Sequence, residues 1–119
     1  MVKSNNEQGR AGGTIRVAVV EDDAKLRQTL EAFINRSGDM QFVAGYGSAE
    51  AALEGLLEDR PNVVLMDIRL PGMSGIECVS RLRKVLPETK AVMLTAYEDT
   101  DDVFRSLTVG AFGYMVKSA

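Results

Sequence analysis

Three carboxylates in this chain stand directly after short, mainly apolar runs. Glu21 and Asp22 follow Ile15–Val20, and Asp67 ends the run that begins at Val63. Such runs, rich in β-branched residues and bounded by turn residues, are typical of strands that a parallel sheet buries on both faces. Ligands of open α/β sheets bind at the carboxyl ends of the strands, where these three side chains would lie. The three carboxylates are therefore candidates for chemistry.

Crowding of these carboxylates predicts a metal site. If the strands before them are neighbours, two like charges about 4 Å apart repel by on the order of 4 kcal/mol at an effective dielectric constant of about 20. Mg²⁺ relieves this repulsion because it takes one or two carboxylates together with water and phosphate oxygens. Glu21 and Asp22 could instead cap the helix that follows, a role that we expect for Asp23. The crowding argument favours the metal.

Two further residues at strand ends suit a phosphoryl group. Thr95 ends a fourth apolar run and Lys117 follows a fifth, and they would supply a hydroxyl donor and a cation. Thr95 by itself is a common residue at such a position, so its alignment with Lys117 is what makes it a candidate. An aspartate nucleophile, a metal ion and a lysine together indicate phosphoryl transfer to a carboxylate.

The composition excludes several other functions. The chain of 119 residues has no histidine, which rules out His-based nucleophile pairs, His-based metal sites and phosphohistidine. The net charge of -3 argues against a nucleic-acid surface. The single cysteine, Cys78, cannot form an internal disulfide and fits a cytoplasmic protein. The apolar runs are too short to span a membrane, and the N-terminus is too polar for a signal peptide.

The apolar patterns predict strands that alternate with helices. We expect strands at 15–20, 42–44, 63–67, 91–95 and 112–116. We expect helices that begin near Asp23, Ser48, Ser74 (with Glu77 in a capping box) and Asp99–Asp102. Apolar stripes at helical spacing, which include Phe33 and Leu57, are expected to face the sheet. This order predicts an α/β domain with a doubly wound parallel sheet and right-handed crossovers.

The two ends of the chain depart from this pattern. Residues 1–13 are polar and end in a glycine pair, and we expect a disordered leader before a single domain over residues 14–119. A doubly wound sheet of this kind calls for one more helix after the last strand, and none follows here. We therefore expect apolar surface to be bare on one face of the sheet. We interpret the domain as C-terminally truncated, or as completed by a partner.

Four segments in register resemble the receiver domain of bacterial two-component response regulators. They are residues 19–23, 65–75, 94–96 and 113–117, and the resemblance extends from about Thr14 to the end of the chain. It implies a flavodoxin-like, five-stranded sheet in the order 2-1-3-4-5. The loop at 68–75 is similar to the branch of the family whose output is a helix-turn-helix domain. Ser118 stands in place of the proline that often follows the site lysine, and that branch often lacks this proline.

The resemblance implies roles for the residues at the strand ends. Asp67 would be the phosphoacceptor. Asp22 would bind Mg²⁺ directly and Glu21 through water, with Asp67 and the backbone carbonyl of Arg69 as further ligands. Lys117 would pair with Asp67 before phosphorylation and with the phosphoryl oxygens afterwards.

Two residues would transmit the change. The resemblance implies that Thr95 moves toward the phosphoryl group and that Tyr114 follows it inward, although a tyrosine on a strand is equally well explained as core. Arg69 and Tyr97 lie two residues beyond Asp67 and Thr95. They would flank the phosphoryl group, and we hypothesise that they shield it from water.

The implied partners follow from this switch. A sensor histidine kinase would donate the phosphoryl group. The face formed by the fourth helix and the fifth strand would then change its binding preference. Domains of this family commonly form a homodimer through that face. The output would be transcription, with DNA contacted only through an output domain absent from this chain. The domain would be no enzyme beyond its own phosphotransfer and dephosphorylation.

Two other functions compete with the switch. A Mg²⁺-dependent phosphatase that forms an aspartyl phosphate is disfavoured, because such enzymes use a second acid at the position of Arg69. A receiver used only for protein contacts is the alternative from a different class. Such domains usually lose an acid or the lysine, whereas this chain keeps Glu21, Asp22, Asp67 and Lys117.

Overall fold

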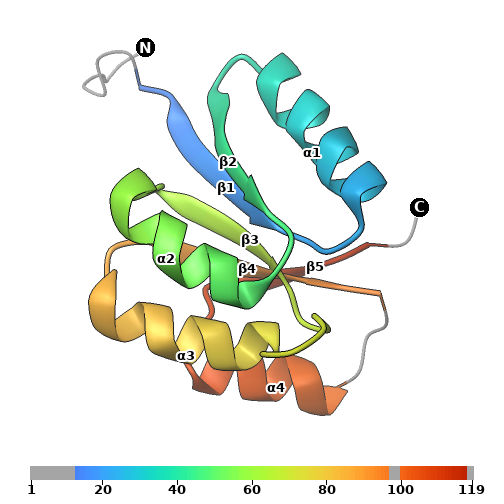
Figure 1. The fold of residues 1–119 in the computed structure, drawn as a ribbon, viewed down its shortest axis with the longest axis vertical. Helices are drawn as coiled ribbons and strands as arrows, with labels where there is room; N and C mark the ends of the chain where they lie inside the picture. Colours follow the sequence, from blue (N-terminus) through green and yellow to red (C-terminus); the bar gives the residue numbers. More distant parts are fainter. Residues whose placement is uncertain (1–12, 97–99, 118–119) are drawn as a thin grey trace.

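Strands and helices alternate along the whole of the computed structural model, which describes residues 13–96 and 100–117 (Figure 1). The strands are β1 (Ile15–Val20), β2 (Met40–Tyr46), β3 (Val63–Asp67), β4 (Lys90–Thr95) and β5 (Gly113–Val116). The helices are α1 (Ala24–Arg36), α2 (Ala49–Asp59), α3 (Gly75–Val85) and α4 (Thr100–Thr108). The expected leader, apart from Gly13, lies outside the described residues.

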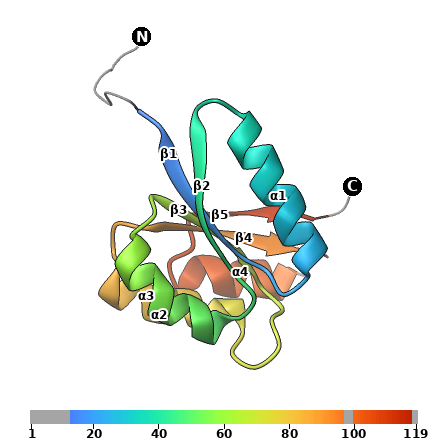
Figure 2. The same cartoon turned by 45° about the horizontal axis from the view of Figure 1, so that its top comes forward.

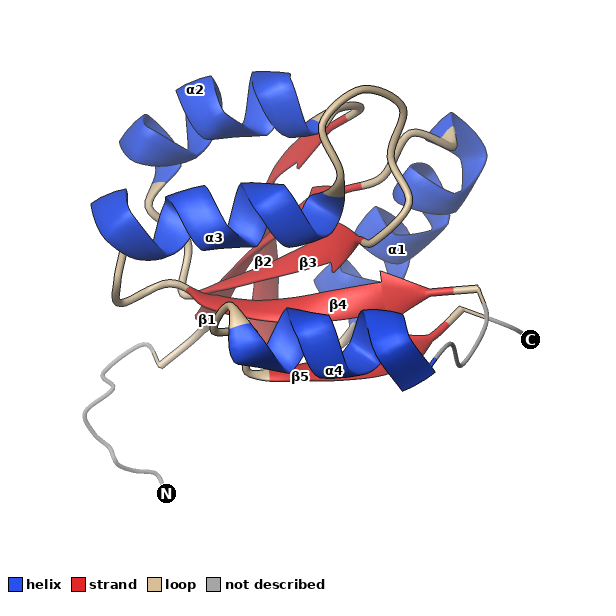
Figure 3. Cartoon of the chain, turned by 90° about the horizontal axis from the view of Figure 1, so that it is seen from below, coloured by secondary structure: helices blue, strands red, loops and turns tan. Residues whose placement is uncertain are grey.

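The sheet is parallel throughout and has the strand order β2-β1-β3-β4-β5, which confirms the predicted fold. Helix α1 packs on one face, and α2, α3 and α4 pack on the other (Figures 1 and 3). This arrangement places β1 and β3 side by side in the centre of the sheet. The residues that follow these two strands therefore meet at one edge.

Side-chain caps fix where the first three helices begin, as predicted. Asp23 accepts hydrogen bonds from the backbone N–H groups of Lys25 and Leu26 at 3.0 and 3.2 Å. Ser48 and Ser74 cap α2 and α3 in the same way. Each cap satisfies N–H groups that have no partner within the helix, and it contributes about 1 kcal/mol to stability. The cap expected from Asp99 lies outside the described residues.

Strand β2 is longer than predicted, because glycine at 45 does not end it. A Cβ atom at Gly45 would lie 3.0 Å from the Phe42 ring and 3.2 Å from the Arg27 side chain. The glycine thus gives room for these side chains to pack against the strand, rather than marking a turn. Strand β5 begins one residue later than predicted, at Gly113.

The two faces of the sheet are covered unequally. Beneath α2 and α3, the core is continuous and includes Val20, Met66 and Met93 at 0% exposure. On the α1 face, the buried cluster consists of Val17, Val19 and Ile34.

Apolar side chains are exposed on the α1 face near β5. Met115, paired with Leu94, points to this face and is 50% exposed. Among the described helices, α1 is the one on this face, and it packs beside β1 and β2 (Figure 2). Bare apolar surface was predicted here and is confirmed. The prediction that Phe33 and Leu57 face the sheet is wrong, since they are 57% and 42% exposed. Each lies at the margin of its helix's apolar stripe, outside the part that contacts the strands.

Among the described residues, no helix combines the length and apolar character that crossing a membrane requires.

Cys78 is expected to be chemically inert in the folded protein. It is fully buried between α2 and α3, with its thiol near the carbonyl oxygen of Ala49, and burial raises its pKa to about 12. Because the thiolate is the reactive species, iodoacetamide at pH 8 should leave the native protein unlabelled and label the unfolded protein completely. The extent of labelling is measured by intact mass spectrometry. Rapid labelling of the native protein would mean that the packing between α2 and α3 opens readily.

Candidate functional site

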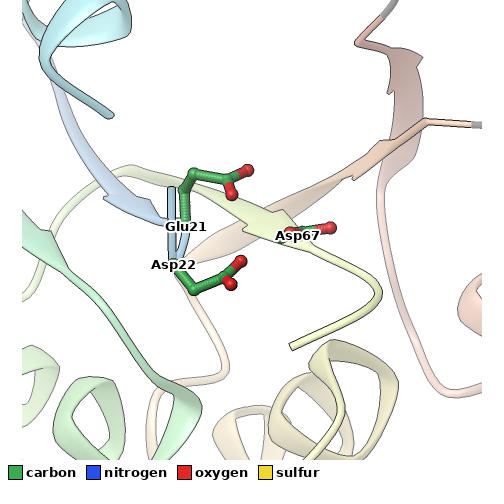
Figure 4. A group of neighbouring side chains, drawn as sticks. All are labelled: Glu21, Asp22 and Asp67. Atoms are coloured by element: carbon green, nitrogen blue, oxygen red, sulfur yellow. The ribbon is translucent and has the colours of Figure 1, made fainter. Parts of the chain in front are cut away.

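Three carboxylates converge where β1 and β3 end, as the sequence predicts (Figure 4). Glu21 and Asp22 follow β1, and Asp67 is the last residue of β3. One carboxylate oxygen from each residue lies within 4.8 Å of the others. Glu21 and Asp67 are buried, whereas Asp22 is exposed. Helix α1 is capped by Asp23 instead, so the cap and the acidic cluster are formed by different residues.

The donor set of this cluster suits a hard divalent cation. All three side chains offer oxygen atoms, and carboxylates that crowd together without a cation repel one another. The buried members lie on the protein side and the exposed member lies toward solvent. An ion bound here would keep open positions for water or for a second oxygen ligand.

Lys117 brings a positive charge to the same cluster from the end of β5. Its Nζ atom lies 3.2 Å from Asp67 Oδ2 and 3.0 Å from Glu21 Oε1. Its backbone N–H donates to the carbonyl oxygen of Thr95 at 2.7 Å, which fixes where the side chain starts. Sequence reasoning anticipated a contact with Asp67 but not the one with Glu21, because nothing in the spacing shows which carboxylates a long side chain can bridge.

Burial and ion pairing act in opposite directions on these groups. Burial raises the pKa of the Glu21 carboxyl, and it outweighs the lowering by the Asp23 N–H and by Lys117. Burial would by itself lower the pKa of Lys117, but its hydrogen bonds and charge interactions with Glu21 and Asp67 prevail and raise it. The lysine therefore stays charged and holds the two buried acids together.

The loop between β3 and α3 is tied down on several sides. The N–H of Arg69 donates to Asp67 Oδ1 at 3.1 Å, and the N–H of Ile68 donates to the carbonyl oxygen of Leu94 at 3.0 Å. From α2, the carboxylate of Glu50 accepts a hydrogen bond from the N–H of Met73 at 2.9 Å. This bond lowers the pKa of Glu50. The backbone of the loop is thus held in one position beside Asp67.

Glu50 was missed by the sequence analysis. It belongs to the first turn of α2, where an acid is explained by the helix dipole alone, and it contacts a backbone N–H rather than a side chain. The sequence holds no signal that distinguishes it from an ordinary surface glutamate.

Thr95 and Tyr114 lie on the α4 side of the sheet. Thr95 is buried at the end of β4. Tyr114 pairs with Met93 and is 41% exposed, so it is no fully buried core residue. It lines a cavity of about 180 Å³ together with Thr100, Val103, Phe104 and Leu107 of α4. Tyr97, which was expected to flank a phosphoryl group, lies outside the described residues.

Fold and site together define a class of α/β domain. A five-stranded parallel sheet in the order 2-1-3-4-5 carries an acidic cluster and a lysine at the carboxyl ends of its strands. The model of the response regulator receiver domain matches residues 17–119. The chain belongs to this family, as its sequence motifs had indicated.

Individual relatives agree with this assignment. The chain is 33% identical over 106 residues to the oxygen regulatory protein NreC of Staphylococcus haemolyticus. The aligned segment covers 88% of this chain and 49% of that protein. The response regulator domain of CheB from Thermotoga maritima is 32% identical, with a TM-score of 0.82 over 87% of this chain and 78% of that one.

A third relative points to the branch that the sequence resembles. A DNA-binding response regulator of the LuxR family from Staphylococcus aureus is 27% identical, with a TM-score of 0.81 over 87% of this chain and 86% of that one. The chain spans about half the length of the curated relatives it matches, NreC among them.

Proposed function

We propose that this domain is a phosphorylation-activated switch in which Asp67 accepts a phosphoryl group from a sensor histidine kinase. The observation that carries the proposal is the contact of Lys117 with buried Asp67, beside two further carboxylates. The chain has no histidine, so a phosphohistidine donor has to come from a partner. Membership of the receiver family supports the same donor.

The transfer step uses residues at the ends of β1, β3 and β5. A carboxylate oxygen of Asp67 forms a bond to phosphorus while the bond from phosphorus to the donor nitrogen breaks, and the imidazole leaves with the electron pair. Lys117 neutralises negative charge on the transferred oxygens. Glu21 and Asp22, with Asp67 and the carbonyl of Arg69, would hold Mg²⁺. The ion, when bound, offsets the charge of the phosphoryl oxygens.

Phosphorylation would then alter the face formed by α4 and β5. It adds about -1.5 to -2 charges and three acceptor oxygens at Asp67. Thr95 would donate to one of these oxygens, and Tyr114 would follow into the space between the sheet and α4. Phe104, Leu107 and Tyr114 expose apolar surface there. A change in this surface would control homodimer formation or contact with an output domain that regulates transcription. The switch would operate in the cytoplasm.

Intact mass spectrometry with acetyl phosphate tests this proposal. The protein should gain one phosphoryl group in the presence of Mg²⁺ and none in EDTA, and Asp67→Asn should gain none under either condition. Asp23→Asn is the matched control, since it removes a neighbouring acid outside the cluster and asparagine still caps α1. A folded wild type that gains no phosphoryl group would instead support a receiver used only for protein contacts.

A further inference from the structure

Helix α4 is held to the rest of the domain by few buried groups. Of its residues, Thr100–Thr108, only Ser106 is buried, and Phe104 and Leu107 are 70% and 46% exposed. A helix with so little buried surface has a low local stability. A single polar contact from a neighbouring element can therefore change its position or its order.

Such a contact comes from the loop that follows Asp67. The guanidinium of Arg69 forms an ion pair with Asp102 of α4, with Nη2 2.7 Å from Oδ2. The Asp102 side chain is 16% exposed and that of Arg69 is 62% exposed, so solvent screens this pair in part, though less than a pair in which both side chains are fully exposed. Arg105, one turn further along α4, lies 3.8 Å from the other oxygen of Asp102. The loop and the helix are thus joined through Asp102.

The same arginine also touches the phosphoacceptor candidate. Its backbone N–H donates to Asp67 Oδ1 at 3.1 Å, so Arg69 contacts Asp67 through its backbone and α4 through its side chain. On the other side of Asp67, Lys117 is shared with Glu21.

We propose that Arg69 couples phosphorylation of Asp67 to α4 by exchanging partners: its guanidinium pairs with Asp102 when Asp67 is unmodified and with phosphoryl oxygens when Asp67 is phosphorylated. This inference rests on the proposed function of Asp67. A phosphoryl group carries more charge than one carboxylate and offers several acceptor oxygens to a planar guanidinium. A phosphoryl group beside Arg69 would draw the guanidinium away from Asp102. Of the two arginines, only Arg105 would then still pair with Asp102. Helix α4 would then lose this ion pair with the loop.

This role differs from shielding the phosphoryl group from water. A shield would change the lifetime of the phosphoryl group and leave α4 unaffected. Partner exchange predicts that α4 depends on Arg69 even before phosphorylation. The two roles can therefore be separated by a measurement on the unphosphorylated protein.

Hydrogen–deuterium exchange of residues 100–108 provides that measurement. Without a phosphodonor, Arg69→Ala should speed exchange of α4 by about two- to fivefold, the range expected for loss of a partly exposed ion pair. Arg69→Lys, which keeps the charge, should restore most of the protection. Arg105→Ala is the matched control, because it removes an ion pair of Asp102 that lies within α4; its effect should be smaller than that of Arg69→Ala. Equal exchange in wild type and Arg69→Ala would overturn the proposal.

A second arm follows the same peptides after addition of acetyl phosphate and Mg²⁺. Exchange of α4 should speed up in wild type but change little in Arg69→Ala, where the ion pair with Asp102 is already absent. An equal acceleration in both proteins, or none in a phosphorylated wild type, would rule out partner exchange. Intact mass of the same samples reports phosphoryl occupancy. An unmodified wild type would count against the function proposed for Asp67, while the unphosphorylated comparison would still decide whether Arg69 holds α4.

Discussion

Replacement of Lys117 by methionine is expected to lower the free energy of unfolding by about 3 kcal/mol or more in buffer that contains EDTA. A loss of this size is typical when one partner of a buried ion pair is removed. Methionine keeps much of the length and apolar stem of lysine but removes the charge. The side chains of Glu21 and Asp67 are only 1% and 5% exposed. Without the ammonium group, two buried carboxylates would face each other without the cation that now lies between them.

Mg²⁺ should reduce this loss. A cation bound by Glu21, Asp22 and Asp67 would replace the missing charge, so the stability difference between wild type and Lys117→Met should narrow when Mg²⁺ is added. Urea unfolding in EDTA and in Mg²⁺ measures both effects. Lys25→Met, which removes an exposed lysine, should stay within about 0.5 kcal/mol of wild type. A Lys117→Met protein as stable as wild type in EDTA would show that the acidic cluster does not depend on the lysine.

Gly75→Ala is expected to destabilise the protein by about 3 kcal/mol, the upper part of the usual range for overpacking. Gly75 is the first residue of α3. A Cβ atom there would lie 2.0 Å from the carbonyl oxygen of Asp67 and 2.9 Å from its carbonyl carbon. Both are backbone atoms at the end of β3, so neither can rotate away. Either the strand end that carries Asp67 or the start of α3 has to move.

Helix propensity predicts the opposite sign for this substitution. Alanine is favoured over glycine by about 1 kcal/mol in a helix interior, which is an upper bound for Gly75 at the first position of α3, so the clash with Asp67 is the larger effect. Thermal or urea unfolding decides between them. Gly113→Ala is the control, because a Cβ atom at that position meets no atom within 4 Å, and its stability should remain close to wild type. A Gly75→Ala protein more stable than wild type would contradict the close approach of α3 to Asp67.

Most of the fold was predictable because its signals are local. Apolar runs located β1, β3 and β4, and the caps Asp23, Ser48 and Ser74 located the helix starts. Alternation of the two elements then left a parallel sheet as the one simple solution. Convergence of Glu21, Asp22 and Asp67 followed, since adjacent parallel strands end at the same edge.

The contacts that tie the site to its surroundings were not predictable. Lys117 bridges to Glu21 across 96 residues of sequence, and Arg69 reaches Asp102 across 33. Glu50 contacts a backbone N–H on another element. Long polar side chains have no periodic pattern, and their partners are set by the spacing of elements in three dimensions. The exposed positions of Phe33 and Leu57 depend in the same way on which part of a helix meets the sheet.

The most direct test of the central claim is to locate the modified residue chemically. Borohydride reduces an aspartyl phosphate to homoserine, so the protein would be incubated with acetyl phosphate and Mg²⁺, reduced, digested and sequenced by mass spectrometry. The phosphorylation switch predicts homoserine at position 67 in wild type and at no position in Asp67→Asn. Homoserine at another carboxylate, such as Asp22, or none in a folded wild type, would contradict the assignment of Asp67 as the phosphoacceptor.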